Sequence, residues 1–438
     1  MSETKERVLA RLSARDATVV VIGIGYVGLS LVVEAAKGGY RAIGFDRDPR
    51  KVEKLNLGES YIPDVPTADV AELVKRGRLS ASTDEAVLAD ADAVIVCVPT
   101  PLNKTKDPDI SFILDAAEAI GKRFKPGVVV VLESTTYPGT TREVVLPRLA
   151  TAGREAGRDF FLAFSPERVD PGNAKWHTRN TPKVLGGMTP ACLDVAKCLY
   201  GAIVDRIVPV SSTDSAEMVK LLENTFRAVN IGLVNEVAIM CQRLGIDTWE
   251  VIGAAATKPF GFMPFFPGPG LGGHCIPVDP HYLAWKLRTL KYTARFIELA
   301  DEINGQMPDF VVEMVRSALN RSKKAVNGSK VLVVGVAYKK DVSDLRESPA
   351  LDILHLLASE GADLSYVDPF VAEVRLEDRT LRAVDPAGSF AAYDCAVIVT
   401  NHSEFDWARL VREAPLIVDT RDATRGIAGA TPDKVVRL

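Results

Sequence analysis

The chain has 438 residues and a formal net charge of -4, with 53 lysines and arginines against 57 aspartates and glutamates. Apolar residues make up 47% of the sequence and charged residues 25%, as in ordinary globular proteins with a sizeable core. The length predicts two or three domains. Because the charges are mixed, without a basic stripe or polybasic patch, we expect neither nucleic acid nor membrane as a partner, and any anionic ligand needs a local site.

The six cysteines show no paired spacing, so we expect free thiols and no structural metal. No charged and apolar leader opens the chain, which favours a reducing, cytoplasmic location. The apolar run 18–33 is interrupted by glycines and falls short of the about 20 residues that a membrane span needs. Residues 1–16 are polar and charged, and we expect them to form a flexible or loosely docked arm.

A glycine-rich turn follows the first expected strand. Residues 19–22 are an apolar run, and a helical pattern begins after the turn and continues to Lys37. Strand, GxGxxG turn and helix come in the order that a dinucleotide-binding motif requires. The residues of the turn that we expect to contact the cofactor are Gly23, Gly25, Tyr26, Val27 and Gly28.

The next expected strand, 41–45, ends in Asp46. This is close to the spacing of about 20 residues at which a carboxylate binds the ribose hydroxyls of adenosine. The same carboxylate would repel a 2'-phosphate, so NAD is favoured over NADP, although Arg47 beside it softens the preference. The alternative is that Asp46 is only a turn residue at a strand end.

Further apolar strands at 93–98 and 128–132 alternate with helical segments near 69–77 and 111–123, as in a doubly wound parallel sheet. Ligands bind at the carboxyl ends of such strands. Residues that follow these ends are therefore expected near the cofactor and the reacting carbon, although the hydroxyls among them often only cap the next helix. They are Pro99, Thr100, Ser134 and Thr135.

Another expected strand, 160–164, is followed by Glu167, Arg168 and Val169. Glu167 is a candidate functional carboxylate because it comes after a strand end on the ligand side. The alternative is an acidic residue in the first turn of a helix. Strands at 184–187 and 207–210 complete the first sheet.

From Ser211 the pattern changes to one long helix that continues to Leu244. Glu217, Lys220 and Asn224 recur on one face of it. A polar face is usually solvated, but a lysine and an asparagine one turn apart also suit a pair of donors for a developing oxyanion.

A loop rich in glycine and proline, 268–280, presents Cys275 beside His274, with Asp279 shortly after. Glycine lets backbone approach a ligand closely, so this loop is suited to bring a thiol to a substrate. An inert cysteine in a turn is the alternative. Aromatic residues in 260–266 could line a pocket or pack in an interface.

Two helices are expected after the loop, at 281–290 and 293–319, and the second is long enough to pack in a homodimer. Residues 327–329 resemble a linker. The segments that follow repeat the pattern of the first domain, at 330–337, 366–369 and 394–400.

This second copy has lost two glycines of its first turn and has gained Lys339, Lys340 and Arg346. Cations in that place suggest a second anion, such as the diphosphate of a nucleotide carried by the substrate. The fold class expected is therefore α/β, with two Rossmann-like doubly wound domains joined by a central helical domain. The expected domains are 1–210, 211–326 and 327–438.

In order along the chain, these motifs resemble the UDP-glucose and GDP-mannose dehydrogenases, which oxidise the C6 alcohol of a nucleotide sugar to a carboxylate. The resemblance extends from Val19 to about Asp422, and its details are most similar to the UDP-N-acetylglucosamine 6-dehydrogenase branch. The motifs that carry it are GIGYVG at 23–28, ESTTYPGT at 133–140, FSPER at 164–168, KLLEN at 220–224, the Cys275 loop, GVAYK at 335–339 and DLRESP at 344–349.

The resemblance implies an NAD-dependent enzyme in which Cys275 traps the aldehyde as a thiohemiacetal and then a thioester. Lys220 and Asn224 would stabilise the oxyanions, and Glu167 would be the base for the hydrolytic water. Asp279 would orient Lys220 or water, and Thr135 would contact the reacting hydroxyl. Arg346 would reach the cofactor, and the UDP-sugar would be bound by Glu167, Arg168, Val169, Lys220, Asn224, Phe266, Gly268, Gly270, Gly272, His274 and Lys339.

Some positions depart from the UDP-glucose members, which commonly have a lysine where this chain has Val278. His274 marks the N-acetylhexosamine type of branch, and with the motifs above it makes UDP-N-acetylglucosamine the expected sugar, while UDP-N-acetylmannosamine, UDP-N-acetylgalactosamine and UDP-glucose stay open. A single-step dehydrogenase of the 6-phosphogluconate or 3-hydroxyacid type is a rival, but it needs neither the thiol nor a third domain. A silent nucleotide-sugar sensor is the other rival, and it would have no reason to keep Cys275, Lys220 and Glu167.

Overall fold

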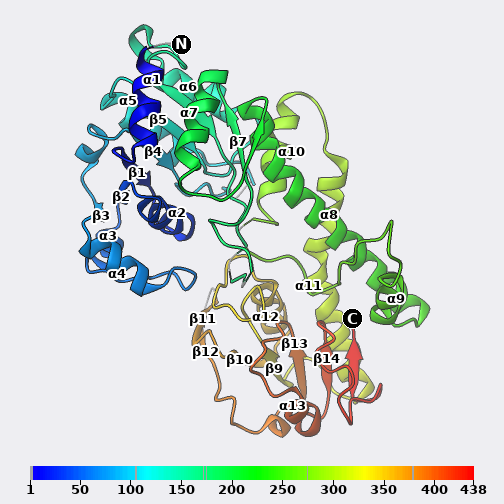
Figure 1. Cartoon of the computed structure of the whole chain (residues 1–438). Helices are drawn as coiled ribbons and strands as arrows, with labels where there is room; N and C mark the ends of the chain where they lie inside the picture. Colours follow the sequence, from blue (N-terminus) through cyan, green and yellow to red (C-terminus); the bar gives the residue numbers. More distant parts are fainter. Residues whose placement is uncertain (1–2, 104–105, 171, 174, 274, 377–378) are drawn as a thin grey trace. The chain divides into compact units, whose positions relative to one another are not determined.

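The computed structural model describes residues 3–103, 106–170, 172–173, 175–273, 275–376 and 379–438. The chain divides into two compact units. Unit 1 comprises residues 1–223 and 281–292, and unit 2 comprises residues 224–280 and 293–438. Each unit holds one of the two large sheets (Figure 1). Because the division falls inside a helix, the domain boundaries expected near residues 210 and 326 stay predictions.

The sheet of unit 1 has eight strands in the order β3-β2-β1-β4-β5-β6-β7-β8. Its neighbouring strands are parallel except for β6 and β7, which are antiparallel. The strands are β1 (Thr18–Ile22), β2 (Arg41–Phe45), β3 (Leu79–Ser82), β4 (Ala93–Val96), β5 (Val129–Leu132), β6 (Phe161–Phe164), β7 (Lys183–Gly187) and β8 (Ile207–Val210). The doubly wound sheet expected from the sequence is confirmed.

Helices separate these strands as the periodicity predicted. They are α1 (Glu3–Ser13), α2 (Tyr26–Lys37), α3 (Pro49–Asn56), α4 (Thr67–Lys75), α5 (Ser111–Lys122), α6 (Leu146–Leu149) and α7 (Pro190–Tyr200), with short turns η1 (Glu85–Leu88), η2 (Thr141–Val145) and η3 (Thr151–Gly153). Helix α10 (Asp279–Thr289) begins in unit 2 and continues into unit 1.

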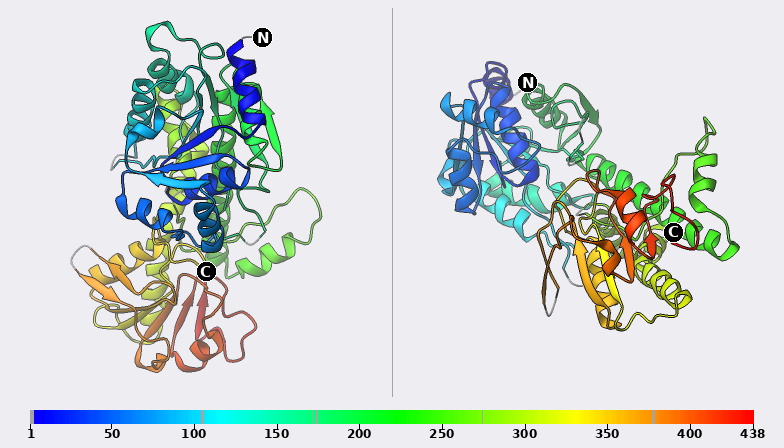
Figure 2. Two further views of the ribbon diagram at one scale, coloured as in Figure 1. Left: turned by 60° about the vertical axis from the view of Figure 1, so that its left-hand side comes forward. Right: turned by 90° about the horizontal axis from the view of Figure 1, so that it is seen from below.

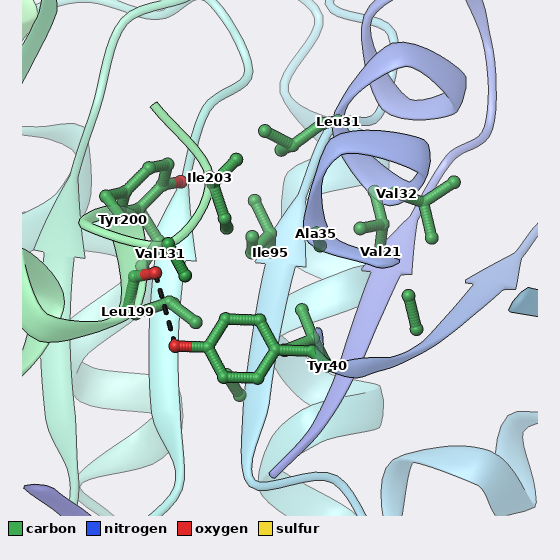
Figure 3. Packing of buried hydrophobic residues seen from close by; sticks show 14 of the residues in the cluster. Val21, Leu31, Val32, Ala35, Tyr40, Ile95, Val131, Leu199, Tyr200 and Ile203 are labelled. Carbon is green, nitrogen blue, oxygen red and sulfur yellow. Dashed lines mark hydrogen bonds between the residues drawn. The ribbon is translucent and has the colours of Figure 1, made fainter. Parts of the chain in front are cut away.

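Alternate residues of each strand point to opposite faces of this sheet, and each face has its own apolar core. On one face, side chains of α2 and α7 pack over β1, β4 and β5 (Figure 3). Tyr40 lies in this layer, and its hydroxyl donates a hydrogen bond to the Leu199 carbonyl oxygen at 3.4 Å (Figure 3). Helices α5 and α6 cover the other face.

The N-terminal arm was expected to be flexible or loosely docked, and the first of these alternatives is wrong. Residues 3–13 form α1, and Val8 and Leu12 are buried in the same core as α2 and α7. Lys5 adds an ion pair with Asp194, with 2.7 Å between Nζ and Oδ2. Val8 and Leu12 are one helical turn apart, so a short apolar stripe is enough to dock the helix where a neighbouring helix supplies the other half of the contact.

The sheet of unit 2 repeats the first. Its parallel strands have the order β10-β9-β13-β14-β15, in which β10-β9-β13 corresponds to β2-β1-β4 of unit 1. The second copy expected from the sequence is therefore present. The strands are β9 (Lys330–Val334), β10 (Asp363–Val367), β13 (Cys395–Ile398), β14 (Ile417–Asp419) and β15 (Val435–Arg437), with a hairpin of β11 (Glu373–Arg375) and β12 (Thr380–Arg382).

Helices α11 (Arg295–Arg321) and α12 (Pro349–Ser359) pack on one face of this sheet, and α13 (Trp407–Glu413) packs on the other. The two views in Figure 2 show this sheet and its helices in yellow to red. Unit 2 also contains α9 (Thr248–Ala255) and the turn η4 (Phe390–Ala392). With the long α8 (Thr213–Leu244), α9 to α11 make the helical segment between the two Rossmann-like domains.

The polar face of α8 is not solvated. Glu217, Lys220 and Asn224 are 1%, 9% and 2% exposed, which excludes the alternative that they only face water. Farther along, Asn235 of α8 donates a hydrogen bond to Asn304 of α11, with 2.8 Å between Nδ2 and Oδ1. In the described part of the chain, none of the helices has the length and apolarity needed to cross a membrane.

Candidate active site

The turn after β1 needs its glycines. Gly23 has a φ of 86°, and a Cβ there would lie 2.7 Å from the carbonyl oxygen of Cys97. A Cβ at Gly28 would lie 1.8 Å from the oxygen of Gly23, whereas one at Gly25 would meet no atom within 4 Å. The turn is thus closed on its inner side and open in front of Gly25, at the N-terminus of α2. Phosphate oxygens bind at this place in dinucleotide-binding folds.

Tyr26 and Asp46 complete the fit of this turn to a dinucleotide. The hydroxyl of Tyr26 is buried and has no hydrogen-bond partner among the described residues, so a bound ligand could supply one. Asp46 stands at the end of β2, where its Oδ2 accepts from Ile24 N at 3.0 Å and from Lys51 Nζ at 3.2 Å. Arg47 beside it pairs with Asp115 at 3.2 Å.

The residues after β4 and β5 are held differently from one another. Ser134 Oγ donates to the Val98 carbonyl oxygen at 2.9 Å, and the Thr100 carbonyl oxygen accepts from Tyr282 at 2.8 Å. The described helices that follow these strands, α5 and η2, have no side-chain cap at their N-termini, so neither hydroxyl caps them. Thr135 is half-buried, and its hydroxyl accepts a short hydrogen bond from Lys220 Nζ. Lys220 of α8 therefore reaches the carboxyl end of β5, where ligands bind in such sheets.

Glu167 lies in a non-helical segment after β6, which excludes the first-turn alternative. Its Oε1 accepts from the backbone nitrogens of Arg168 and Val169 at 3.0 and 2.8 Å, and its Oε2 accepts from Lys183 Nζ at 2.8 Å. Burial opposes the charge of Glu167, but the Lys183 ammonium and these hydrogen bonds outweigh it and lower the pKa of Glu167. The carboxylate is ionised at neutral pH.

The side chain of Arg168 is fixed beside this carboxylate. Its guanidinium makes a two-point ion pair with Glu223 of α8, with 2.6 and 3.1 Å between the paired atoms. A third hydrogen bond, from Nη1, goes to the Pro182 carbonyl oxygen at 2.8 Å. These contacts clamp the segment that carries Glu167 and Val169 against α8.

In unit 2, Asn224 and Asp279 form a buried pair. Nδ2 of Asn224 donates to Oδ2 of Asp279 at 2.5 Å, and Nη2 of Arg227 donates to Oδ1 of Asn224 at 2.6 Å. The carboxylate on one side and the guanidinium on the other fix the orientation of the amide. Asn224 lies one turn after Lys220 on α8, so both side chains leave the same side of the helix.

Cys275 begins a helical turn that leads into α10. Its carbonyl oxygen accepts from the backbone nitrogens of Val278 and Asp279 at 3.1 and 2.8 Å. The residue is half-buried and lies shortly before α10 begins at Asp279. Nearby, the Gly273 nitrogen donates to the Arg346 carbonyl oxygen at 3.0 Å, and the Arg346 guanidinium pairs with Asp344.

The loop before Cys275 packs closely on the second Rossmann-like domain of its own unit. A Cβ at Gly268 would lie 2.5 Å from Arg421 Nη1, and one at Gly272 would lie 2.7 Å from Tyr338 Cβ. Gly270 has a φ of 137°, which favours glycine. Phe266 is exposed and stacks on Trp249 at 5.7 Å. His274 lies outside the described residues.

In the second copy, the residue that corresponds to Asp46 is Asp368, and its carboxylate is occupied by groups of its own domain. Asp368 is buried, its Oδ2 accepts from Val336 N at 2.7 Å, and its Oδ1 accepts from Phe370 N at 2.8 Å. His402 Nε2 lies 3.0 Å from Oδ2. Lys339, half-buried on the turn after β9, keeps a cation at the ligand end of this sheet. The carboxylate of Asp368 therefore differs from that of Asp46 in having a histidine as a partner.

Comparison with known families decides the identity. Three models described as UDP-glucose/GDP-mannose dehydrogenase family match in order: the NAD binding domain over residues 17–204, the central domain over 214–306 and the UDP binding domain over 332–426. The chain belongs to this family. It is therefore an NAD-dependent UDP-sugar dehydrogenase, as its turn after β1 and its second, altered copy had indicated.

Related proteins align with most of the length of this UDP-sugar dehydrogenase. It is 38% identical to the UDP-N-acetyl-D-glucosamine 6-dehydrogenase of Pseudomonas aeruginosa, over 89% of this chain and 92% of that protein. It is 35% identical to the UDP-N-acetyl-D-mannosamine dehydrogenase of Salmonella typhi, over 89% and 94%. The structure of the UDP-D-ManNAc dehydrogenase of Pyrococcus horikoshii is similar at a TM-score of 0.86 and 30% identity, over 96% and 98%.

Two charged residues of this dehydrogenase, Lys183 and Arg421, were not identified from its sequence. Lys183, the first residue of β7, lies between the carboxylates of Glu133 and Glu167. Arg421, after β14, donates from Nε to the Val399 carbonyl oxygen at 2.8 Å, and neither of its terminal nitrogens hydrogen-bonds to a described residue. For Arg421 a signal was present, because it follows a strand end in the second copy. For Lys183 there was none, since a lysine opening a strand is ordinary.

Proposed function

We propose that this dehydrogenase oxidises the C6 hydroxyl of a UDP-N-acetylhexosamine, with UDP-N-acetylglucosamine as the first candidate, to the uronic acid. Cys275 holds the sugar covalently between the two oxidations. The observation that carries this proposal is the turn from Cys275 to Asp279, which sets a half-buried thiol at the start of a helix while Asp279 fixes Asn224. A single-step alcohol dehydrogenase has no use for such a thiol.

NAD, when bound, accepts a hydride in each of the two oxidations, so two molecules are consumed for each sugar. The residues proposed to hold it come from the turn after β1 and from the carboxyl ends of the neighbouring strands, and Arg346 is included because the resemblance in sequence implies it. They are Gly23, Gly25, Tyr26, Val27, Gly28, Asp46, Arg47, Pro99, Thr100, Ser134, Thr135 and Arg346.

The thiolate of Cys275 adds to the C6 aldehyde in this scheme, forming a carbon–sulfur bond and an oxyanion. After the second oxidation the sugar carbon is a thioester. Attack by water breaks the carbon–sulfur bond, releases the uronic acid and returns the thiol. Because the aldehyde stays bound to Cys275, it does not leave the enzyme between the oxidations.

Lys220 and Asn224 are proposed to stabilise the charge on the sugar oxygen. Both are buried side chains with N–H donors, and such donors are most effective away from water. The hydrogen bond between Thr135 and Lys220 supports a place for the reacting hydroxyl beside Thr135. Asp279 supports the scheme through Asn224, whose amide it orients.

Glu167 is proposed to take the proton from the attacking water. Its lowered pKa keeps it ionised at neutral pH, which a base requires. The UDP-sugar is proposed to contact Glu167, Arg168, Val169, Lys220, Asn224, Phe266, Gly268, Gly270, Gly272, His274 and Lys339. Lys339 suits the diphosphate best, because it is a cation at the ligand end of the second sheet.

The choice of sugar rests on the branch-like motifs and on the relatives. UDP-N-acetylglucosamine is favoured by the relative at 38% identity, and UDP-N-acetylmannosamine is the second candidate because a relative at 35% and a structure with a TM-score of 0.86 bear that name. Measuring kcat/KM for these two sugars, UDP-N-acetylgalactosamine and UDP-glucose tests the proposal. A dominant preference for UDP-glucose would overturn it.

A homodimer built on α8 and α11 is part of the proposal. Large apolar side chains stand exposed on both helices: Leu222, Phe226, Leu233, Met240 and Leu244 on α8, and Phe296 and Leu299 on α11. Such a surface is more apolar than a monomer needs, and a second copy would cover it. Light scattering at micromolar concentration should give twice the mass of one chain, and a fully active monomer would refute this part.

The remaining parts of the proposal come from the sequence. They are the cytoplasm as the location, the supply of precursors for a cell-surface polysaccharide as the cellular role, and domain boundaries at residues 210 and 326. The family matches, which end at residue 204, run from 214 to 306 and resume at 332, support these boundaries.

A further inference from the structure

A buried lysine bridges two buried carboxylates in unit 1. Nζ of Lys183 lies 2.7 Å from Glu133 Oε2 and 2.8 Å from Glu167 Oε2. The three side chains are 5%, 0% and 9% exposed. They come from three places in the sheet: the end of β5, the start of β7 and the segment after β6. Nothing in the scheme above gives Lys183 or Glu133 a role.

Glu133 is held on its other side as well. The hydroxyl of Tyr200, the last residue of α7, donates a short hydrogen bond to Glu133 Oε1. Figure 3 shows Tyr200 in the apolar layer beside Leu199 and Ile203, so its hydroxyl is fixed by the core of the domain. The series from Tyr200 through Glu133 and Lys183 therefore ends on Glu167 and ties that carboxylate to the rigid sheet.

Burying these charges is costly unless each one is paired. An ammonium with no carboxylate here would be strongly destabilising, and so would a carboxylate with no ammonium. The arrangement is therefore expensive for mere packing, since apolar side chains of similar volume would fill the same space at less cost. This suggests that the group beside it, Glu167, needs the charge of Lys183.

We propose that Lys183 is a positioning residue for Glu167: it keeps the carboxylate ionised and turned so that the hydrolytic water meets a base, and Glu133 with Tyr200 holds Lys183 in place. This inference rests on the function proposed above, in which Glu167 serves the hydrolysis of the Cys275 thioester.

The charged and titratable groups around Glu167 agree with this role. Burial acts against both charges, but the attraction of the two carboxylates raises the pKa of Lys183, so its ammonium persists at neutral pH. Burial raises the pKa of Glu133, while Lys183 and the backbone lower that of Glu167. Lys220 also favours the ionised form of Glu167. The Cys97 thiol stays neutral, because burial and the carboxylates raise its pKa.

One consequence can be measured. Removing the ammonium should raise the pKa of Glu167 by about one to three units, the usual effect of an adjacent opposite charge. The rate at which the acyl group leaves Cys275 falls at low pH, where Glu167 becomes protonated, and we call this fall the acid limb. Without the ammonium, the acid limb should lie at a higher pH than in the wild type. The thiol does not titrate in this step because its sulfur is acylated, so the acid limb reports on the base alone.

The experiment compares the wild type, Lys183→Met, Lys183→Arg and Glu133→Gln. Each protein is mixed with NAD and UDP-N-acetylglucosamine, excess substrate is removed, and loss of the Cys275 adduct is followed by intact mass spectrometry from about pH 3 to 9, a range that includes the lowered pKa of Glu167 in the wild type. Lys183→Met removes the charge at similar length, Lys183→Arg keeps it, and Glu133→Gln removes the competing carboxylate. Tm is measured for every protein.

We expect the acid limb of Lys183→Met to move up by about one unit or more. In Lys183→Arg the midpoint of the acid limb should lie within about 0.3 pH units of the wild-type value, even if the rate of hydrolysis is lower. In Glu133→Gln it should stay in place or move down, because Lys183 is left to Glu167 alone. A loss of packing would affect Lys183→Met and Glu133→Gln in the same direction, because both residues are buried. An upward shift of the acid limb in the first variant alone therefore indicates an effect of charge.

The inference is overturned if Lys183→Met slows hydrolysis equally at every pH, or if Glu133→Gln moves the acid limb up as Lys183→Met does. Should Lys183→Met fail to fold, the pair Lys183→Arg and Glu133→Gln decides: an upward shift in either contradicts it. If the wild type yields two NADH per sugar but the limb does not respond to Lys183, only this inference fails. If no adduct forms at all, the proposed function fails with it.

Discussion

Asn224 donates a hydrogen bond to Asp279, with 2.5 Å between Nδ2 and Oδ2, and both side chains are buried. The relationship joins the middle of α8 to the first residue of α10, directly after the turn that begins at Cys275. From the sequence, Asp279 was expected to orient Lys220 or a water. In the structure, this carboxylate accepts a hydrogen bond from Asn224, a partner that the sequence did not predict.

Asp279→Ala should therefore lower kcat by about ten- to a hundredfold, the effect of losing a hydrogen bond to a charged group. KM should change less, because the amide of Asn224 is needed most when the sugar oxygen becomes an oxyanion. Asp279→Asn keeps an acceptor without the charge and should fall in between. Asp309→Asn, on an exposed position of α11, is the control. A folded Asp279→Ala enzyme with wild-type kcat would contradict this assignment.

Arg421 should contribute to binding of the UDP moiety. Burial lowers its pKa to about 10, but the guanidinium is still charged at neutral pH, and its terminal nitrogens have no hydrogen-bond acceptor among the described residues. A nucleotide diphosphate would provide one. Arg421→Met should raise KM for the UDP-sugar by about ten- to a hundredfold and leave KM for NAD unchanged.

Arg425→Met is the matched control for this measurement, because Arg425 is 44% exposed and already paired with Asp247 and Asp422. An Arg421→Met enzyme with a lower Tm but unchanged KM values would show that the guanidinium only packs against Gly268.

The sequence predicted those parts of the fold that local patterns encode. Periodicity predicted the strands beside the turn at 23–28 and the long helix that ends at Leu244. The turn itself was predicted from its glycines, which the close approach of backbone segments requires. The second copy was visible for the same reason, since its apolar strands recur in the same order and at similar spacing.

Features that depend on partners far away in the chain were not predictable in this way. Helix α1 docks because α7 supplies a surface for Val8 and Leu12, and α7 begins almost two hundred residues later. The burial of Lys183 depends on Glu133 and Glu167, which arrive from two other strands. Periodicity describes one element at a time, so it finds residues at strand ends but not the pairs they form.

Glu217 should make the stability of unit 1 depend on pH. Its carboxylate is buried and accepts from Gly139 N at 2.5 Å and from Thr141 N at 2.8 Å. Burial outweighs these hydrogen bonds and raises the pKa of Glu217 to about 7. The unfolded value is about 4.3, so the folded state binds the proton more tightly and is stabilised at low pH.

This contribution to the free energy of unfolding should be complete below about pH 4.3 and be lost as pH rises through about 7, a change of about 3 kcal/mol. Glu217→Gln cannot ionise and should lose the dependence: its Tm relative to wild type should rise between pH 5 and 8. Glu250→Gln, on the exposed first turn of α9, should show no such trend. Parallel Tm curves for Glu217→Gln and wild type would refute the prediction.

Replacing Cys275 and replacing Glu167 should stop the reaction at different stages. Without the thiol of Cys275 the aldehyde is not trapped, so Cys275→Ala should not complete the second oxidation, although some aldehyde-level redox exchange can persist. Cys198→Ala, which removes a half-buried thiol of unit 1, whereas Cys275 belongs to unit 2, is the control and should keep two NADH per sugar. Limiting UDP-sugar and absorbance of NADH measure the ratio, and a wild-type ratio near one would exclude the thioester scheme.

Glu167→Gln should keep the trap and lose the base. The amide oxygen of the introduced side chain can still accept from the backbone nitrogens that Glu167 uses, but its NH₂ group then faces the Lys183 ammonium, so neither charge nor orientation is preserved. We expect a burst of about two NADH per active site, then slow turnover, with a sugar acyl group on Cys275 detectable by intact mass spectrometry. If both burst and adduct are missing, Glu167 acts before the thioester forms or the thiol is not the nucleophile. Activity of Cys275→Ala distinguishes the two, because a fully active variant would leave the thiol without a role.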